Sequence, residues 1–282
     1  MKCIFFNLLI LTIILSACRQ STRSSINQSD NFKSILQHFN NHWADSSYWD
    51  DGKAEVAVYN ATREIYKKTR VFEYTFITVS EDFNKEFGVK TDDYTRKDLF
   101  RVMKLNAFAE VKTDNYPYHF LSSMFIMRNS PLYLQKMTSG SQEWCGITFK
   151  EFLNQTNNFK LIYHSYWDGE GDGEKQIPAD LLFEDQLIYS LRSLKFKDGL
   201  NFNARVLGSQ VSNKVGKQDI YEANFKVSKT DSSWKVQVNL DPAKINEFEF
   251  RKVYPNILIR KSTWDKQTLV LNKTSRYAYW QN

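Results

Sequence analysis

The stretch WDGEGDGE, residues 167–174, carries the most conspicuous spacing of charged side chains in this sequence. It places Asp168, Glu170 and Asp172 at every second position, as in the first half of a calcium-binding loop. Such a loop also needs a bidentate glutamate at its twelfth position, which here is Ala179. We therefore interpret the stretch as a solvated, glycine-rich loop between a strand and a helix. The three acids remain candidate calcium ligands, and we predict no metal site.

Cys145 and His164 are candidates for a nucleophile and its general base, and Glu143 could orient the histidine. A cysteine hydrolase also needs a lowered thiol pKa and an oxyanion hole, and the sequence carries a signature of neither. A free cysteine is more often a small buried hydrophobic residue. We predict no catalytic residues and no cofactor, and we keep a Cys-His hydrolase as an alternative.

His38 and His42 lie four residues apart, which is the spacing of the zinc-binding histidines in one class of metallopeptidase. Phe39 stands where that motif has its catalytic glutamate, and no third ligand can be identified. The favoured interpretation is a pair of solvent-facing histidines near the end of a helix.

The N-terminus predicts export and lipid anchoring. Lys2 precedes an apolar run over residues 4–14, which is too short for a membrane-spanning helix. Leu15-Ser-Ala-Cys18 then matches the lipobox of bacterial lipoproteins, in which the cysteine is acylated and the peptide is cut before it. We predict a signal peptide over residues 1–17, lipidation of Cys18 and anchoring in a membrane through the acyl chains.

The Ser-rich segment 18–28 has the composition of a flexible tether, and residues 29–282 are expected to form one domain. The net charge of +6 comes from interspersed basic and acidic residues, which suggests at most a weak attraction to anionic lipid surfaces. We expect no nucleic-acid partner, because the chain is predicted to be exported. Cys145 is the only cysteine outside the first 18 residues, which excludes a disulfide within the mature chain.

Alternating apolar and polar residues predict a mainly β fold. About a dozen short strands should form a strongly curved antiparallel sheet, either an open barrel or a clam, with an N-terminal helix over 30–43 and one inserted helix over 178–192. The last two strands are expected over 268–271 and 277–280. A membrane-spanning barrel is the alternative, but charged residues such as Glu73 and Lys104 recur inside the predicted strands. The aromatic residues could line a ligand cavity or form a packed core.

Several segments carry a resemblance to known proteins. The sequence resembles uncharacterised lipoproteins of Bacteroidota that often bear the label "septum formation inhibitor Maf", a label that does not suit a lipidated β protein. The last third of the chain is similar to periplasmic β-clam proteins. Neither resemblance implies catalytic residues. The segments are Trp49–Val56, Val79–Phe83, Tyr116–Tyr118, Gln142–Gly146 and His164–Gly171, and for the β-clam likeness Tyr221–Val227 and Tyr254–Arg260.

Together these patterns predict an outer-membrane lipoprotein of the bacterial cell envelope. Surface-exported lipoproteins of some Bacteroidota resemble one another in carrying an acidic cluster just after the lipidated cysteine. Here the nearby residues Arg19 and Arg23 are basic, and this difference favours a domain that faces the periplasm. We expect the domain to bind a lipid, a glycolipid or an envelope protein along the concave face of its sheet. A structural or assembly role without a ligand is the alternative.

Overall fold

A computed structural model describes residues 30–281. The predicted signal peptide (1–17) and tether (18–28), with the predicted lipidation site Cys18, lie outside these residues. Among the helices of the described residues, none has the length and apolar character needed to span a membrane.

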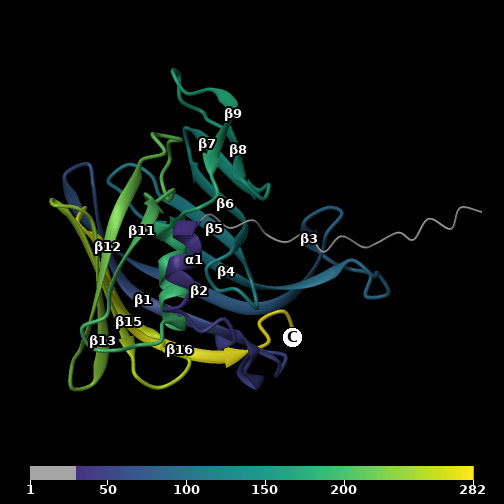
Figure 1. The fold of residues 1–282 in the computed structure, drawn as a ribbon. Coiled ribbons are helices and arrows are strands. Elements are labelled where there is room, and N and C mark those ends of the chain that lie inside the picture. Colours follow the sequence, from purple (N-terminus) through teal and green to yellow (C-terminus); the bar gives the residue numbers. More distant parts are fainter. Residues whose placement is uncertain (1–29, 282) are drawn as a thin grey trace, which may run out of the picture.

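One strongly curved, unclosed antiparallel sheet of 16 strands dominates the described part of the chain (Figure 1). Strands that follow one another in the sequence are mostly neighbours in the sheet, because short turns can join antiparallel partners. The first nine strands are β1 (Ala54–Ile65), β2 (Lys68–Asn84), β3 (Val89–Lys90), β4 (Leu99–Val111), β5 (Tyr118–Met127), β6 (Leu134–Glu143), β7 (Gly146–Asn154), β8 (Asn158–His164) and β9 (Asp172–Pro178).

The remaining strands bring the last strand beside the first, since β16 pairs with β1 in the middle of the sheet. The short strand β10 pairs in parallel with β11 and is the exception to the antiparallel arrangement of the described strands. These strands are β10 (Leu182–Phe183), β11 (Asn201–Leu207), β12 (Ile220–Lys229), β13 (Ser233–Asp241), β14 (Lys244–Arg251), β15 (Leu258–Ser262) and β16 (Thr268–Tyr277).

The few helices lie inside the curve of the sheet, as Figure 1 shows for α1 and for the helix drawn in green beside it. The second group, residues 184–193, is called the inserted helical segment below. The N-terminal helices are α1 (Asp30–Leu36), η1 (Trp43–Asp45) and η2 (Ser47–Trp49), and the inserted helical segment consists of η3 (Glu184–Gln186), α2 (Leu187–Ser190) and η4 (Leu191–Ser193).

The mainly β fold with a curved antiparallel sheet is confirmed, and two details of the prediction are wrong. The inserted helix was expected to begin at Pro178, but Pro178 ends β9, where it pairs with Asn158, and the helical segment begins six residues later. A separate last strand was expected over 277–280, but β16 runs on without a break to Tyr277. In both places pairing with a neighbouring strand overrides the local pattern.

The concave face of the sheet is filled by the protein's own side chains. Leu187, Tyr189 and Leu191 of the inserted helical segment are at most 1% exposed and pack against inward-facing residues of the strands. Aromatic rings such as Phe225 and Phe248 belong to the same core. The aromatic residues therefore build a packed core here, and in the described residues the protein's own side chains occupy the concave face where a ligand was expected.

Candidate functional site

A groove with a volume of about 790 Å³ lies on the outer face of the sheet, the face turned away from the packed helices. Strands β2, β4, β5, β6 and β7, which lie side by side in Figure 1, form its floor. Its lining consists mainly of residues that alternate with the buried core positions of these strands. We call this hollow the outer groove.

Successive pairings across the strands place apolar side chains in one row of the outer groove. Phe108, Leu121 and Ile147 are 40%, 52% and 58% exposed, although they belong to regular strands. Exposed apolar side chains that cluster in this way are typical of binding surfaces. The members of this apolar row, in order of pairing, are Thr75, Phe108, Leu121, Gly140 and Phe149.

Gly140 opens the middle of the apolar row. It pairs with Leu121 on one side and with Phe149 on the other. A side chain added at Gly140 would meet no atom closer than 3.9 Å, the backbone oxygen of Leu121, so the space above this glycine is open. A residue without a side chain between two large apolar ones leaves a notch in the outer face, and this notch is part of the groove.

A polar row with two carboxylates borders the apolar row. Glu110 pairs with His119, and His119 pairs with Gln142. The register that pairs Tyr74 with Ala109 places the neighbouring Glu73 opposite Glu110, and both carboxylates line the groove. Two like charges directly opposite on neighbouring strands destabilise a sheet. We call this the acidic row, with the members Glu73, Glu110, His119 and Gln142.

A second hollow of about 370 Å³ continues along the outer face and shares Thr138 with the outer groove. Its charges are neutralised within the protein. The ammonium of Lys104 lies 2.5 Å from a carboxylate oxygen of Glu81, and that of Lys136 lies 2.8 Å from one of Glu151. The basic end of this surface therefore offers few unpaired charges to a ligand.

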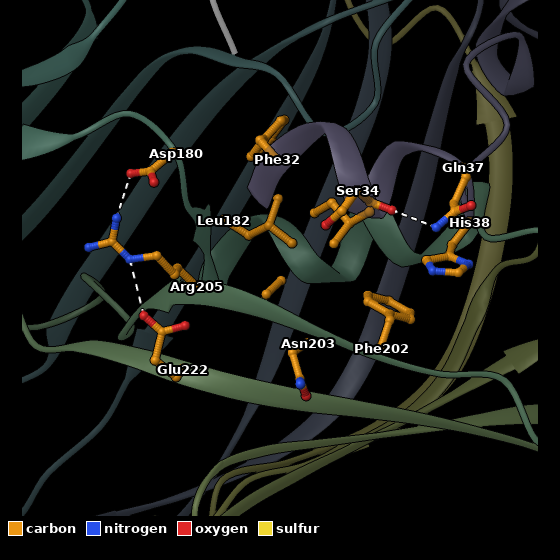
Figure 2. A pocket seen from close by; sticks show the side chains of 12 residues that line it. Phe32, Ser34, Gln37, His38, Asp180, Leu182, Phe202, Asn203, Arg205 and Glu222 are labelled. Atoms are coloured by element: carbon orange, nitrogen blue, oxygen red, sulfur yellow. Dashed lines mark hydrogen bonds and ion pairs between the residues drawn. The ribbon is translucent and has the colours of Figure 1, made fainter. Parts of the chain in front are cut away.

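A third hollow, of about 320 Å³, lies between α1 and strands β11 and β12 (Figure 2). Arg205 spans its wall and contacts Asp180 at 2.6 Å and Glu222 at 3.4 Å. His38 stacks on Phe202 with a ring separation of 4.9 Å, and burial lowers the pKa of this histidine. Its charged groups are engaged with one another, so this hollow is a less suitable ligand site than the outer groove.

The stretch with the candidate calcium ligands connects two paired strands, β8 and β9, and not a strand and a helix as expected. Glu170 accepts hydrogen bonds from the backbone N–H groups of Val215 and Gly216, both at 3.0 Å. Asp172 faces His164 at 3.3 Å, and Asp168 is exposed. No group of three or more potential metal ligands exists among the described residues. The two hydrogen bonds from Val215 and Gly216 hold the loop that carries Glu170 against the segment after β11.

The structure does not bring Cys145 and His164 into hydrogen-bonding contact. The thiol of Cys145 lies 3.2 Å from the hydroxyl of Tyr116 and raises the pKa of that tyrosine to about 12, whereas His164 contacts Asp172. Glu143, the proposed orienting residue, accepts a hydrogen bond from Asn213 at 3.3 Å. Cys145 is exposed and not a buried hydrophobic residue, because it lies in the turn between β6 and β7.

The two histidines near the N-terminus also lie apart from any ligand set in the described residues. Helix α1 ends at Leu36, so His38 and His42 do not share a helical face. The side chain of His42 contacts Asp45 at 2.8 Å and is 84% exposed. The helix was predicted to continue to Trp43, but the backbone of Phe39 instead forms a bridge with Leu194.

Lys150 is a buried cation inside the curve of the sheet. Its ammonium donates hydrogen bonds to the carbonyl oxygens of Gln210 and Lys214, at 2.5 and 2.9 Å. Burial lowers the pKa of this lysine to about 8. These contacts hold the loop after β11 against the inner side of β7, so we assign Lys150 a structural role.

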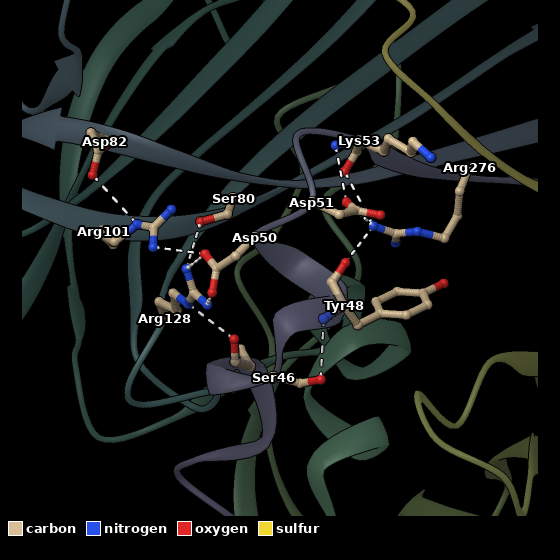
Figure 3. Close-up of polar contacts among 11 residues, drawn as sticks. Ser46, Tyr48, Asp50, Asp51, Lys53, Ser80, Asp82, Arg101, Arg128 and Arg276 are labelled. Atoms are coloured by element: carbon tan, nitrogen blue, oxygen red, sulfur yellow. Dashed lines mark hydrogen bonds and ion pairs between the residues drawn. The ribbon is translucent and has the colours of Figure 1, made fainter.

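The segment around Trp49-Asp-Asp is a charged anchor for the N-terminal helices (Figure 3). Asp50 accepts two hydrogen bonds from Arg128, at 2.6 and 2.7 Å, and one from Arg101 at 2.9 Å. The hydrogen bonds from Arg128 lower the pKa of Asp50 to about 2. Asp51 contacts Arg276 of β16 at 2.6 Å. These acids hold the start of the domain against the sheet.

Sequence reasoning missed the outer groove, although one signal of it was present. Phe108, Leu121 and Ile147 occupy outward positions at which polar residues are expected in a half-buried strand. Their clustering depends on the register of three strand pairs, which the sequence alone does not specify.

The fold and site define a mainly β protein with an open, curved sheet and an apolar groove on its outer face. No protein-family model matches the sequence, and a search of curated proteins finds no significant match. Among solved structures, the chain is similar to a DUF1089 family protein from Pseudomonas aeruginosa, with 11% sequence identity and a TM-score of 0.37. That similarity covers 64% of this chain and 87% of the other. It is too low to indicate a shared function.

Proposed function

We propose that this protein is a lipid-anchored component of the outer membrane, faces the periplasm, and binds an apolar ligand in its outer groove. The observation that carries the proposal is the apolar row, in which Phe108 and Leu121 remain exposed around the notch at Gly140. The lipobox that ends at Cys18 supports the anchor.

The size and lining of the outer groove fit a small-molecule site. Ligand pockets are typically about 300–1,000 Å³ and combine apolar walls with a few polar groups. The outer groove has a volume of about 790 Å³, with Glu110, His119 and Gln142 beside its apolar row. A lipid or a glycolipid has the chain and the polar group that such a lining would contact. An envelope protein with an exposed apolar segment is the alternative occupant.

Filling the notch tests this proposal. Gly140 lies within β6, has open space above it and does not need a positive φ angle, so Gly140→Val should fold. Native mass spectrometry of the chain purified from its own envelope should show a bound small molecule that the variant loses. Ser228→Val, at an exposed position of β12 outside the groove, is the matched control and should keep the ligand. Retention of the same ligand by Gly140→Val would refute the outer groove as its site.

The same experiment separates the alternatives. A protein that travels with the wild-type chain and is lost with Gly140→Val would favour the assembly role over lipid binding. The anchor is tested separately by metabolic labelling with a fatty-acid analogue, which should label the wild-type chain and leave Cys18→Ser unlabelled. Equal labelling of the Cys18→Ser variant would contradict lipidation at this residue.

A further inference from the structure

We propose that the ligand of the outer groove is a cationic amphiphile, an apolar chain that carries an ammonium or similar group. This inference rests on the proposed function and adds the chemical class of the ligand. The geometry that points to it is the acidic row directly beside the apolar row.

The carboxylates of the acidic row lack a strong cationic partner within the protein. The described contacts of Glu110 include one ion pair, to His119 at 3.4 Å, and Glu73 makes no ion pair with any described residue. Lys112 follows the end of β4 but pairs with neither carboxylate. A bound cation would relieve the repulsion between two like charges that face each other across neighbouring strands.

An anionic ligand finds no comparable site at the other end of the surface. Lys104 and Lys136 are each paired with a carboxylate of the protein, and their side chains are only 15% and 16% exposed. The side chain of Lys90 is 57% exposed and lies 3.9 Å from Glu81, a carboxylate that Lys104 already contacts, so a ligand anion could reach Lys90. A ligand carboxylate or phosphate would have to compete with the ion pairs of Lys104 and Lys136, and Lys90 alone would not replace them. A ligand cation would face Glu73, which makes no ion pair with a described residue, and Glu110, whose described ion pair is the 3.4 Å contact with His119.

The spacing of the rows suits one molecule that contacts both. Residues two apart on a strand lie about 6.8 Å from each other on the same face, twice the rise of about 3.4 Å per residue. Glu110 and Phe108 are related in this way on β4. An ammonium group near Glu73 and Glu110 would therefore place the first carbons of its chain over Phe108 and Leu121, next to the notch at Gly140.

Three probes with the same chain and different head groups test this inference: octylammonium, octanoate and octanol. The full chain is held in lipid nanodiscs, and binding is measured by titration calorimetry with empty nanodiscs subtracted. We expect octylammonium to bind most tightly at low ionic strength and to lose its advantage as salt is added, because exposed charges are screened. Glu73→Gln with Glu110→Gln should weaken octylammonium binding on the order of five- to tenfold and leave octanol binding unchanged.

Reversing the charge of the acidic row provides a second test of the ligand's charge. Glu73→Lys with Glu110→Lys should make octanoate the preferred probe, whereas Glu222→Gln on the distant strand β12 should change nothing. Circular dichroism and thermal unfolding check that each variant is folded. Leu121→Ser should weaken binding of all three probes, and Val253→Ser, at a 76% exposed position away from the groove, is its control.

The outcomes separate this inference from the proposed function. Equal affinities for the three probes, all lowered by Leu121→Ser, would refute the cationic ligand and keep the apolar groove. Tightest binding of octanoate to the wild-type chain would also refute it. If no probe binds, or if Leu121→Ser has no effect, the proposed function fails as well. An apolar peptide with a terminal lysine that binds when octylammonium does not would replace the small amphiphile with a protein partner.

Discussion

Glu55 and Arg192 form a buried ion pair through two hydrogen bonds of 2.8 and 2.9 Å, with residue exposures of 2% and 5%. Glu55 lies on β1 and Arg192 in the inserted helical segment, so the pair joins the middle of the sheet to the helices that fill its curve. The guanidinium also lies 5.0 Å from the ring of Trp43 and 5.6 Å from that of Trp49.

Removing one partner of this pair should destabilise the fold strongly. Glu55→Gln leaves a buried, uncompensated guanidinium, and breaking a buried pair in this way costs about 3–5 kcal/mol. Urea unfolding at neutral pH measures the loss. Glu247→Gln, which breaks a more exposed ion pair to Lys235, is the control and should change the unfolding midpoint little. A loss no larger than that of the control would contradict the importance of the buried pair.

Asp50 should make stability depend on acid pH. Hydrogen bonds from Arg128 lower its pKa from 3.8 to about 2 in the folded state. The unfolded chain therefore binds the proton first, and the stabilising contribution is present above about pH 4 and is lost as the pH falls toward 2. The free energy of unfolding of Asp50→Asn should be lower than that of the wild type at neutral pH, and the difference should shrink over this window. A difference that is constant with pH would count against this role.

Lys150 should make the stability of the fold depend on alkaline pH. Its pKa is about 8 in the folded state and 10.5 in the unfolded chain, because burial disfavours the charged form. Between these values the unfolded state binds more protons, so the contribution of Lys150 to stability should rise with pH. Denaturant unfolding of the wild type and of Lys150→Met over pH 8–10.5 isolates this effect. The two curves should run parallel if Lys150 is not buried in solution.

Glu170 should restrain the segment after β11. Glu170→Ala removes the acceptor for the N–H groups of Val215 and Gly216, so these amides should exchange with deuterium faster. Added calcium should leave the melting temperature of the wild type unchanged, since Glu170 is already bound to backbone groups. A clear calcium-dependent stabilisation that Glu170→Ala abolishes would restore the metal interpretation.

The acidic row should cost stability in the ligand-free protein. Glu110→Gln removes one of two like charges that face each other across β2 and β4, and it should stabilise the fold by about 0.2–1 kcal/mol. Thermal unfolding at low and at high salt provides the measurement, with the gain largest at low salt. Glu174→Gln, at an exposed position of β9 where Lys160 lies 2.7 Å away, should not be stabilising. A loss of stability in Glu110→Gln would mean that the two carboxylates do not repel each other.

The sequence by itself determined the class of the fold. Alternation of apolar and polar residues specifies a strand and the face that it buries, because side chains on a strand point to opposite sides in turn. The paired strands β4 and β5 follow from such local patterns. Local patterns could not place the start of the inserted helical segment. Pairing of Pro178 with Asn158 extends β9 over residues that were expected to be helical.

The tertiary structure alone decided where a ligand could bind. The concave face became core once the inserted helical segment packed into it, and the opposite face kept the hollow. Phe108, Leu121 and Gly140 are distant in the sequence, and the register of two strand pairs brings them into one row. A shift of one residue in either pair would turn these side chains to the other face of the sheet. The proposed binding surface is therefore a property of the strand register.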